Sequence, residues 1–148
     1  MKSRLLQQLF LHNPIRVYLQ RTFEAPEVLS GINLAPGSRC LEIGCGHGAG
    51  TLLISQHVTC DGIVGVDIDP QAIHRARRYV ARRPPWARDV RTDHIEFGRE
   101  DAATLSFGDN SFDAVFLFGV LNSVDDWKRV VAEVFRVLKP GGTFAFKE

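Results

Sequence analysis

A short apolar segment that runs directly into clustered glycines constrains the fold of this chain more than any other feature of its sequence. Residues 39–43 read Arg-Cys-Leu-Glu-Ile, which predicts a buried strand, and glycines follow at positions 44, 46, 48 and 50. Residues 49–58 then carry the pattern of a helix. Glycines let a backbone turn tightly and lie against a ligand, because no Cβ stands in the way. The segment therefore predicts a strand–turn–helix unit with a ligand at the turn.

Strand-like and helix-like segments alternate along the rest of the sequence. Strands are expected at residues 39–43, 62–67, 94–97, 112–118 and 143–146, and helices at 49–58, 70–83 and from 125 or 126 to the turn at 140–142. Apolar strands that alternate with helices are typical of a parallel sheet covered on both faces. The predicted fold class is therefore α/β, with a doubly wound, mainly parallel sheet of about five strands.

The N-terminal segment, residues 1–38, shows helical spacing of its apolar residues. Pro14 and Pro26 interrupt this pattern, so it predicts two or three short helices. The first, from Ser3, is expected to be an amphipathic helix rather than a targeting signal, and no stretch approaches the ~20 apolar residues of a membrane span. We expect a single domain, with residues 1–38 as a helical lid and residues 39–148 as the ligand-binding body.

The composition and the cysteine spacing argue against several classes of partner. The 148 residues are 45% hydrophobic and 24% charged with a net charge of +1, so the whole molecule offers no electrostatic case for a nucleic acid or membrane partner. Cys40, Cys45 and Cys60 lack paired CxxC spacing, which argues against a metal site and fits a reducing cytoplasm. The arginines between residues 75 and 91 are interpreted as a solvated helix face in preference to an RNA or phosphate contact.

Two acids indicate which ligand the glycine turn would take. Asp67 ends the second strand about twenty residues past the glycines, where a carboxylate can accept both hydroxyls of a ribose. Gly44-x-Gly46-x-x-Ala49 also satisfies a dinucleotide fingerprint, so an NAD-type ligand stays open on the glycines alone. Glu42, however, would repel a pyrophosphate and attract a sulfonium or ammonium group. The two acids therefore favour a positively charged nucleoside.

The segment 41–48, Leu-Glu-Ile-Gly-Cys-Gly-His-Gly, resembles the first motif of the class I methyltransferases that depend on S-adenosyl-L-methionine (SAM). Residues 64–69 resemble the second motif of that family and residues 99–107 its third-strand segment. Residues 111–124 and 138–142 resemble its fourth-strand and fifth-strand landmarks. The likeness covers about residues 39–148 in the expected order, and it implies a Rossmann-like fold, methylation activity and SAM as the cofactor, with S-adenosyl-L-homocysteine as the product.

The resemblance also implies roles for particular residues. Gly44 and Gly46 would line the methionine part, Asp67 would hold the ribose, and Ile68 would pack on adenine. Asp101 would lie near the adenine amino group with the Ala102 backbone beside it. The expected cofactor-binding residues are Glu42, Gly44, Cys45, Gly46, Gly48, Asp67, Ile68, Asp101, Ala102 and Phe118.

Several of these residues have simpler interpretations. Glu42 could cap backbone amides, and Asp101 could be an ordinary loop acid. Asp69, directly before Pro70, is expected to be a helix cap, which leaves Asp67 for the ribose. His47 and Cys45 are expected to be spacers within the loop, and no catalytic residue is predicted.

The acceptor is predicted to be a small molecule. After the fourth strand this chain has Phe-Gly-Val-Leu at 118–121, where some amino methyltransferases have an Asn/Asp-Pro-Pro-aromatic tetrad, and it has no Pro-Cys pair of the cytosine-C5 kind. Both differences argue against nucleic acid as a partner. Residues 121–126 resemble the group that modifies small metabolites, in which a histidine often stands at the place of Asn122 or Ser123. No general base is therefore assigned.

The family normally adds two strands after the fifth, and this sequence ends at Glu148. The edge at residues 143–146, with two phenylalanines, is therefore expected to pair with a second copy or a partner subunit, unless the sequence is shortened from a longer protein. Two alternatives to a working enzyme follow: a SAM-binding module that is inactive alone, and, more remotely, an NAD-dependent oxidoreductase.

Overall fold

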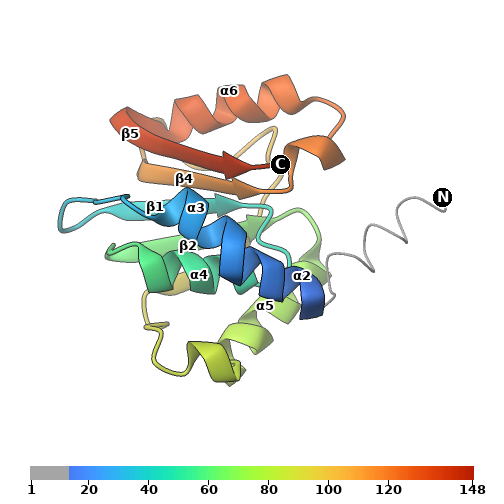
Figure 1. Cartoon of the computed structure of the whole chain (residues 1–148). Coiled ribbons are helices and arrows are strands. Elements are labelled where there is room, and N and C mark those ends of the chain that lie inside the picture. Colours follow the sequence, from blue (N-terminus) through green and yellow to red (C-terminus); the bar gives the residue numbers. More distant parts are fainter. Residues whose placement is uncertain (1–13) are drawn as a thin grey trace.

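Five parallel strands form one sheet in the order β3-β2-β1-β4-β5, as Figure 1 shows for this computed structural model, which describes residues 14–148. The strands are β1 (Arg39–Ile43), β2 (Gly62–Asp67), β3 (Ile95–Arg99), β4 (Phe112–Phe118) and β5 (Leu138–Lys147). The strand order reverses on either side of β1, which is the arrangement of a doubly wound α/β fold. The predicted fold class is confirmed.

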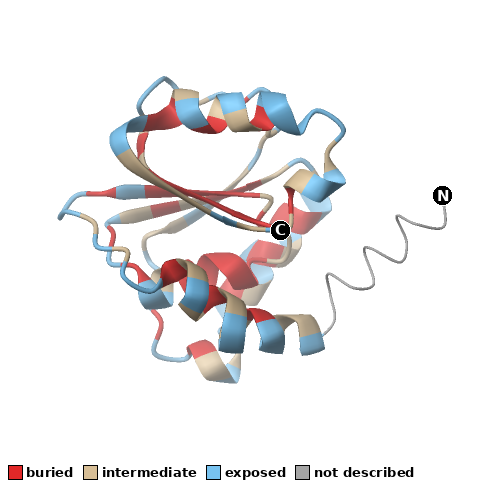
Figure 2. Ribbon diagram, turned by 45° about the horizontal axis from the view of Figure 1, so that its top comes forward, coloured by how far each residue is buried: buried red, intermediate tan, exposed pale blue. Residues whose placement is uncertain are grey.

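Helices cover both faces of the sheet, and Figure 2 shows the buried strands between them. The longer elements after β1 are α4 (Ala49–His57), α5 (Pro70–Arg82) and α6 (Trp127–Val137), with short 3-10 turns η2 (Pro85–Ala87) and η3 (Leu121–Ser123). Side chains of α3 and α4 pack with Phe116 and Phe118 on one face, whereas α6 packs with Val115 and Leu117 on the other. Both faces of β4 are thus buried, which explains its almost continuous apolar sequence.

The boundary between α6 and β5 differs from the prediction. The sequence predicts that residue 138 belongs to the helix, but α6 ends at Val137 and Leu138 already pairs with Phe112. The turn predicted at 140–142 is present as an irregularity within β5, because the next pairing joins Ala114 to Thr143 and Gly141 has φ +75°. A Cβ on Gly142 would lie 2.9 Å from the Asp113 carbonyl oxygen, so the glycine lets β5 run close to β4. Pro140 is tolerated because β5 is an edge strand of the described sheet. The third strand also lies slightly later than predicted, at residues 95–99.

The described N-terminal residues form three short helical elements that follow one another directly along the chain. It consists of α2 (Pro14–Leu19), a π-helical turn η1 (Gln20–Glu24) and α3 (Ala25–Leu29). The Ala25 N–H donates to the Gln20 carbonyl, so the wider turn takes in one extra residue just before the proline, which has no N–H to donate. The structure thus has the short helices that the sequence predicts, with α2 beginning at Pro14 and α3 beginning beside Pro26.

The helix predicted from Ser3, before the interruption at Pro14, lies outside the described residues. Within residues 14–148, no helix combines the length and apolar character needed to cross a bilayer.

Candidate functional site

A cavity of about 310 Å³ lies at the carboxyl ends of β1, β2 and β4, where their last residues Ile43, Asp67 and Phe118 contribute to its wall. This is the position at which open α/β sheets hold their ligands, because the strand order reverses there. Nine of the ten residues predicted from the sequence line it: Glu42, Gly44, Cys45, Gly46, Asp67, Ile68, Asp101, Ala102 and Phe118. The fold thus brings together residues from four separate segments of the chain.

The glycine turn forms the floor of this cavity, and it needs glycine for reasons that differ by position. Gly44 has φ +74°, and a Cβ there would collide with the Val120 side chain. Gly46 has φ +53° with open space around it, so its missing side chain leaves room in the cavity. The N–H groups of residues 44 and 45 donate to the Val66 carbonyl at 2.8 and 2.9 Å, which holds the turn against β2.

Gly48 is the one predicted residue that does not line the cavity. It has φ +91° at the start of α4, and a Cβ there would lie 3.2 Å from Cα of Ala76. Its role in this structure is therefore the close packing of α4 against α5.

Asp67 connects the two segments that border the cavity. One of its carboxylate oxygens accepts the Gly46 N–H and the other accepts the Asp69 N–H, both at 3.0 Å. Each carboxylate oxygen can accept more than one hydrogen bond, so both retain capacity for the hydroxyls of a ligand. The backbone donors fix the orientation of the carboxylate at the end of β2.

Asp69 caps the helix that follows, as the sequence predicted. Its side chain accepts the Gln71 N–H at 2.9 Å at the N-terminus of α5, and it also accepts from Arg75 at 3.1 Å. These contacts lower the pKa of the Asp69 carboxyl, chiefly through the Gln71 amide. The prediction that Asp69 caps α5 is therefore confirmed.

Glu42 lies in the wall of the cavity rather than at its mouth, because only 2% of its surface is exposed. Its carboxylate accepts a hydrogen bond from the Thr51 hydroxyl of α4, and it lies so close to Gly50 that a Cβ there would collide with it. Burial raises the pKa of Glu42 to about 7, the Thr51 hydrogen bond opposes this shift, and the negative charge of Asp67 adds to it. The carboxyl is thus poised to ionise fully when a cation approaches.

The opposite part of the cavity is formed by the segments after β2 and β3. Ile68 is 59% exposed and lines the cavity, as an apolar surface for a flat ring would. Asp101 and Ala102 line the same cavity, and the Asp101 carboxylate accepts the Ala103 N–H at 2.9 Å. This local turn is the simpler interpretation considered for Asp101, and it leaves the second carboxylate oxygen for a ligand.

Two residues of the N-terminal helix border the same cavity, and the sequence did not single them out. Gln20 is buried in the π-helical turn, and Arg16 pairs with Glu24 at 2.6 Å. Residues 16 and 20 are four apart, so helical spacing alone would have placed them on one face. The sequence does not show, however, which face of the helix turns toward the sheet.

Cys45 and His47, the two potentially reactive side chains of the glycine loop, both pack against α5. Cys45 is buried with Ile73 and Ala76, and this burial raises the pKa of its thiol, so the nucleophilic thiolate is disfavoured. The ring of His47 packs edge-on against Tyr79, with 5.1 Å between the ring centroids. Both observations agree with their interpretation as spacers.

The charges around the cavity suit a cation better than an anion. Its acidic lining residues are Glu42, Asp67, Asp69, Glu100 and Asp101, whereas its basic ones are Arg16 and Arg75. Both arginines are paired, Arg16 with Glu24 and Arg75 with Asp69. A ligand with a positive charge, hydroxyl groups and a flat ring fits this lining, and a doubly negative pyrophosphate does not.

Comparisons with known proteins agree with this geometry. Residues 41–146 match a family model described as a methyltransferase domain. A demethylmenaquinone methyltransferase of Symbiobacterium thermophilum is 37% identical over 119 residues, which cover 80% of this chain and 45% of that protein. An arsenite methyltransferase of Halobacterium salinarum is 33% identical over 78% of this chain and 28% of its own length. The crystal structure of a SAM-dependent methyltransferase from Methanosarcina mazei superposes with a TM-score of 0.63 at 38% identity, covering 76% of this chain and 53% of that one. The chain thus spans about half, or less, of the length of these relatives.

Proposed function

This chain belongs to the methyltransferase domain family, and from that premise we propose that it transfers a methyl group from SAM to a small-molecule acceptor. The observation that carries the proposal is the pair of carboxylates, Glu42 and Asp67, on either side of a glycine turn with open space at Gly46. This arrangement attracts a cationic nucleoside, whereas the two carboxylates would repel the pyrophosphate of a dinucleotide.

The residues of the cavity fit the separate parts of SAM. Asp67 would accept the ribose hydroxyls, with the Gly46 N–H holding its carboxylate in place. Ile68 would pack on the adenine ring, and Asp101 with the Ala102 backbone would meet the edge of the ring. Glu42, in the wall of the cavity, would balance the positive charge of the ammonium in the methionine part. Gly48 would contribute indirectly, by holding α4 against α5.

The chemistry of transfer needs little from the protein beyond position. SAM supplies a methyl group on a sulfonium, which already contains its leaving group. Holding two reactants in line can contribute about 7 to 11 kcal/mol in favourable cases. Phe118 and Val120 at the end of β4, together with Gln20 of the N-terminal helix, would exclude water from the reacting groups. A base is required only if the acceptor holds its proton tightly, and we assign none.

A small-molecule acceptor is favoured by the relatives and by the chain itself. One relative acts on demethylmenaquinone and another on arsenite, by their names. The Phe-Gly-Val-Leu segment at 118–121 provides apolar and backbone groups, without the asparagine or aspartate of the amino methyltransferase tetrad. Nucleic acid is accordingly not proposed as the acceptor.

A module that binds SAM but needs another polypeptide for turnover is the second candidate. The chain spans 45% of the demethylmenaquinone methyltransferase, and Phe146, which stacks on Phe144 in the edge strand β5, is 52% exposed. A second copy, a partner subunit or further chain could cover this edge. We also propose a reducing compartment, the cytoplasm, since the cysteines at 40, 45 and 60 are free and buried.

The two candidates are separated by turnover. Purified chain is incubated with SAM and an extract of small metabolites, and S-adenosyl-L-homocysteine is quantified by mass spectrometry, with Asp67→Ala as the control. Formation of the product by the native chain alone supports the enzyme. Tight binding of S-adenosyl-L-homocysteine without turnover would support the module.

A further inference from the structure

Two further hollows adjoin the cofactor cavity: the first lies between α2 and the side chains of Tyr79 and Trp86, and the second lies along α5, beside His47 and the Pro84-Pro85 segment. Their volumes are about 400 and 550 Å³. They share His47 and Tyr79, and His47 also lines the cofactor cavity, so the three spaces meet at this residue. We name the two hollows together the α2–α5 groove. Its residues are Pro14, Val17, Tyr18, Arg21, His47, His74, Arg75, Arg78, Tyr79, Arg82, Arg83, Pro84, Pro85 and Trp86.

One end of the groove is basic. It contains four arginines and two histidines, and no acidic residue is among those that line it. Arg75 is paired with Asp69, and Arg83 donates to the Thr92 hydroxyl at 2.9 Å. Within residues 14–148, Arg78 and Arg82 make neither a hydrogen bond nor an ion pair. They lie four residues apart on α5 and present two unneutralised guanidinium groups to the same hollow.

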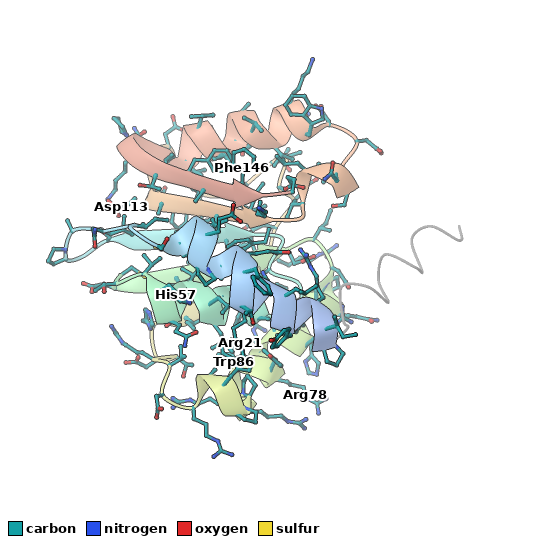
Figure 3. All side chains as sticks on the ribbon, in the orientation of Figure 1. Arg21, His57, Arg78, Trp86, Asp113 and Phe146 are labelled. Carbon is teal, nitrogen blue, oxygen red and sulfur yellow. The ribbon has the colours of Figure 1, made fainter. Side chains whose placement is uncertain are left out.

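The other end of the groove is aromatic. Val17 and Tyr18 of α2 face Tyr79 of α5 and Trp86 of η2 across it. The one cation on this side, Arg21, lies over the rings of Tyr18 and Trp86, at 6.0 and 5.7 Å from their centroids. Figure 3 shows Arg21 beside Trp86, with Arg78 farther along α5.

We propose that the α2–α5 groove binds an anionic amphiphile, whose phosphate or carboxylate lies on Arg78 and Arg82 and whose apolar body lies against Tyr79 and Trp86. The two guanidinium groups provide charge-assisted hydrogen bonds to the head group. The aromatic walls remove the apolar body from water. Inorganic phosphate would bind at the basic end of the groove only, and a neutral amphiphile would bind at the aromatic end only.

The size of the groove favours a single small molecule over a polymer. The basic end is confined to one stretch of α5. Of the other arginines in the run, Arg77 donates to the Phe97 carbonyl and Arg91 pairs with Asp93, whereas Arg88 lies exposed outside the groove. A nucleic acid would need a longer track of free cations. Because the proposal concerns binding alone, it does not depend on methyl transfer.

The test reads occupancy of the groove from one tryptophan. The chain has two tryptophans, and Trp127 lies on α6, so Trp127→Phe leaves Trp86 as the only tryptophan. In this background the emission of Trp86 is titrated with octyl phosphate below its micelle concentration, and with octanol and inorganic phosphate as comparators. Saturable binding of octyl phosphate, about tenfold or more tighter than either comparator, is expected.

Two sets of variants decide the assignment. Arg78→Gln with Arg82→Gln should weaken octyl phosphate by about tenfold or more without changing octanol, whereas Arg88→Gln, an exposed arginine outside the groove, should leave both unchanged. If the double variant bound octyl phosphate as tightly as the chain that keeps Arg78 and Arg82, the proposal would be overturned.

Two further arms distinguish the source of the anion. If the chain sediments with vesicles containing anionic phospholipid, in a manner that depends on Arg78 and Arg82, and yet fails to bind monomeric octyl phosphate, the groove is a membrane contact and the proposal is wrong. Preferential binding of a single-stranded oligonucleotide over octyl phosphate through the same arginines would overturn it as well.

Discussion

The Gly46 N–H donates to the carboxylate of Asp67 at 3.0 Å, which joins the glycine turn after β1 to the end of β2. This bond couples two properties of the site. It orients the carboxylate that is proposed to hold the ribose, and it fixes the turn that leaves room for the rest of the nucleoside. A change at either residue therefore affects both the shape and the charge of the cavity.

Replacing Asp67 with alanine should weaken binding of S-adenosyl-L-homocysteine by about tenfold or more, which corresponds to about 1.4 kcal/mol. The variant loses the acceptor for the ribose hydroxyls and the anchor for the Gly46 N–H. Calorimetric titration measures the affinity, and Asp89→Ala, which removes an exposed acid elsewhere, serves as the control. Unchanged affinity in Asp67→Ala would remove the ribose assignment.

Gly46 and Gly37 offer a matched test of the open space in the turn. Both have positive φ, +53° and +84°, and a Cβ at either would have nothing within 4 Å. Alanine at either position should therefore cost a similar backbone strain of about 1–2 kcal/mol in stability. Only Gly46→Ala places a methyl group at the cavity, so only it should also weaken S-adenosyl-L-homocysteine. Equal affinities in the two variants would show that the ligand does not approach Gly46.

The sequence predicted the sheet and most of the cavity because their signals are local. Continuous apolar strands, the glycine turn and the Asp69–Pro70 helix start each depend on a few neighbouring residues. The end of α6 at Val137 was placed wrongly because Leu138 fits a helical stripe as well as a strand, and pairing with Phe112 decides between them.

The contributions of Gln20 and Gly48 could not be read in the same way. Gln20 reaches the cavity because the N-terminal helix packs beside the glycine turn, and no local sequence pattern shows which face of that helix is turned inward. Gly48 belongs to the glycine motif, but its contact with Ala76 appears only when α5 is in place. Tertiary packing, rather than local preference, determines both.

Glu42 should make the ligand-free chain less stable as the pH rises. Its pKa in the folded chain is about 7 against an ordinary value of 4.5, so the folded state binds more protons between these values. The stabilising effect is therefore present at acidic pH and is lost as the pH rises through this window, by roughly 3 kcal/mol at most. Urea unfolding at pH 5 and pH 8 measures it, and Glu42→Gln should show a smaller change. An identical pH dependence in the variant would contradict the role of this carboxyl.

Binding of S-adenosyl-L-homocysteine should release protons near pH 6.5 if its ammonium is balanced by Glu42. The cation favours the ionised carboxylate, so binding lowers the pKa of Glu42 and expels the proton that burial had retained. Calorimetry in two buffers of different ionisation enthalpy counts the protons, with Glu42→Gln as the reference. Equal proton release by the native chain and the variant would place the ammonium elsewhere.

Gln20→Ala should raise the dissociation constant of S-adenosyl-L-homocysteine by a few-fold while changing thermal stability little. Gln20 borders the cavity from the N-terminal helix, so its truncation should open the cavity on this side, without disturbing the glycine turn, if the helix acts as a lid. Thr22→Ala, an exposed change in the same π-helical turn, controls for effects on the helix itself. If both variants bind equally well, the helix does not act as a lid.

Calorimetric titration of the native chain with S-adenosyl-L-homocysteine, and separately with NAD, tests the identity of the ligand most directly. A cavity bounded by Glu42 and Asp67 should bind one equivalent of the nucleoside thioether and show no heat of binding with the dinucleotide. Saturable binding of NAD, or no binding of S-adenosyl-L-homocysteine, would contradict the account.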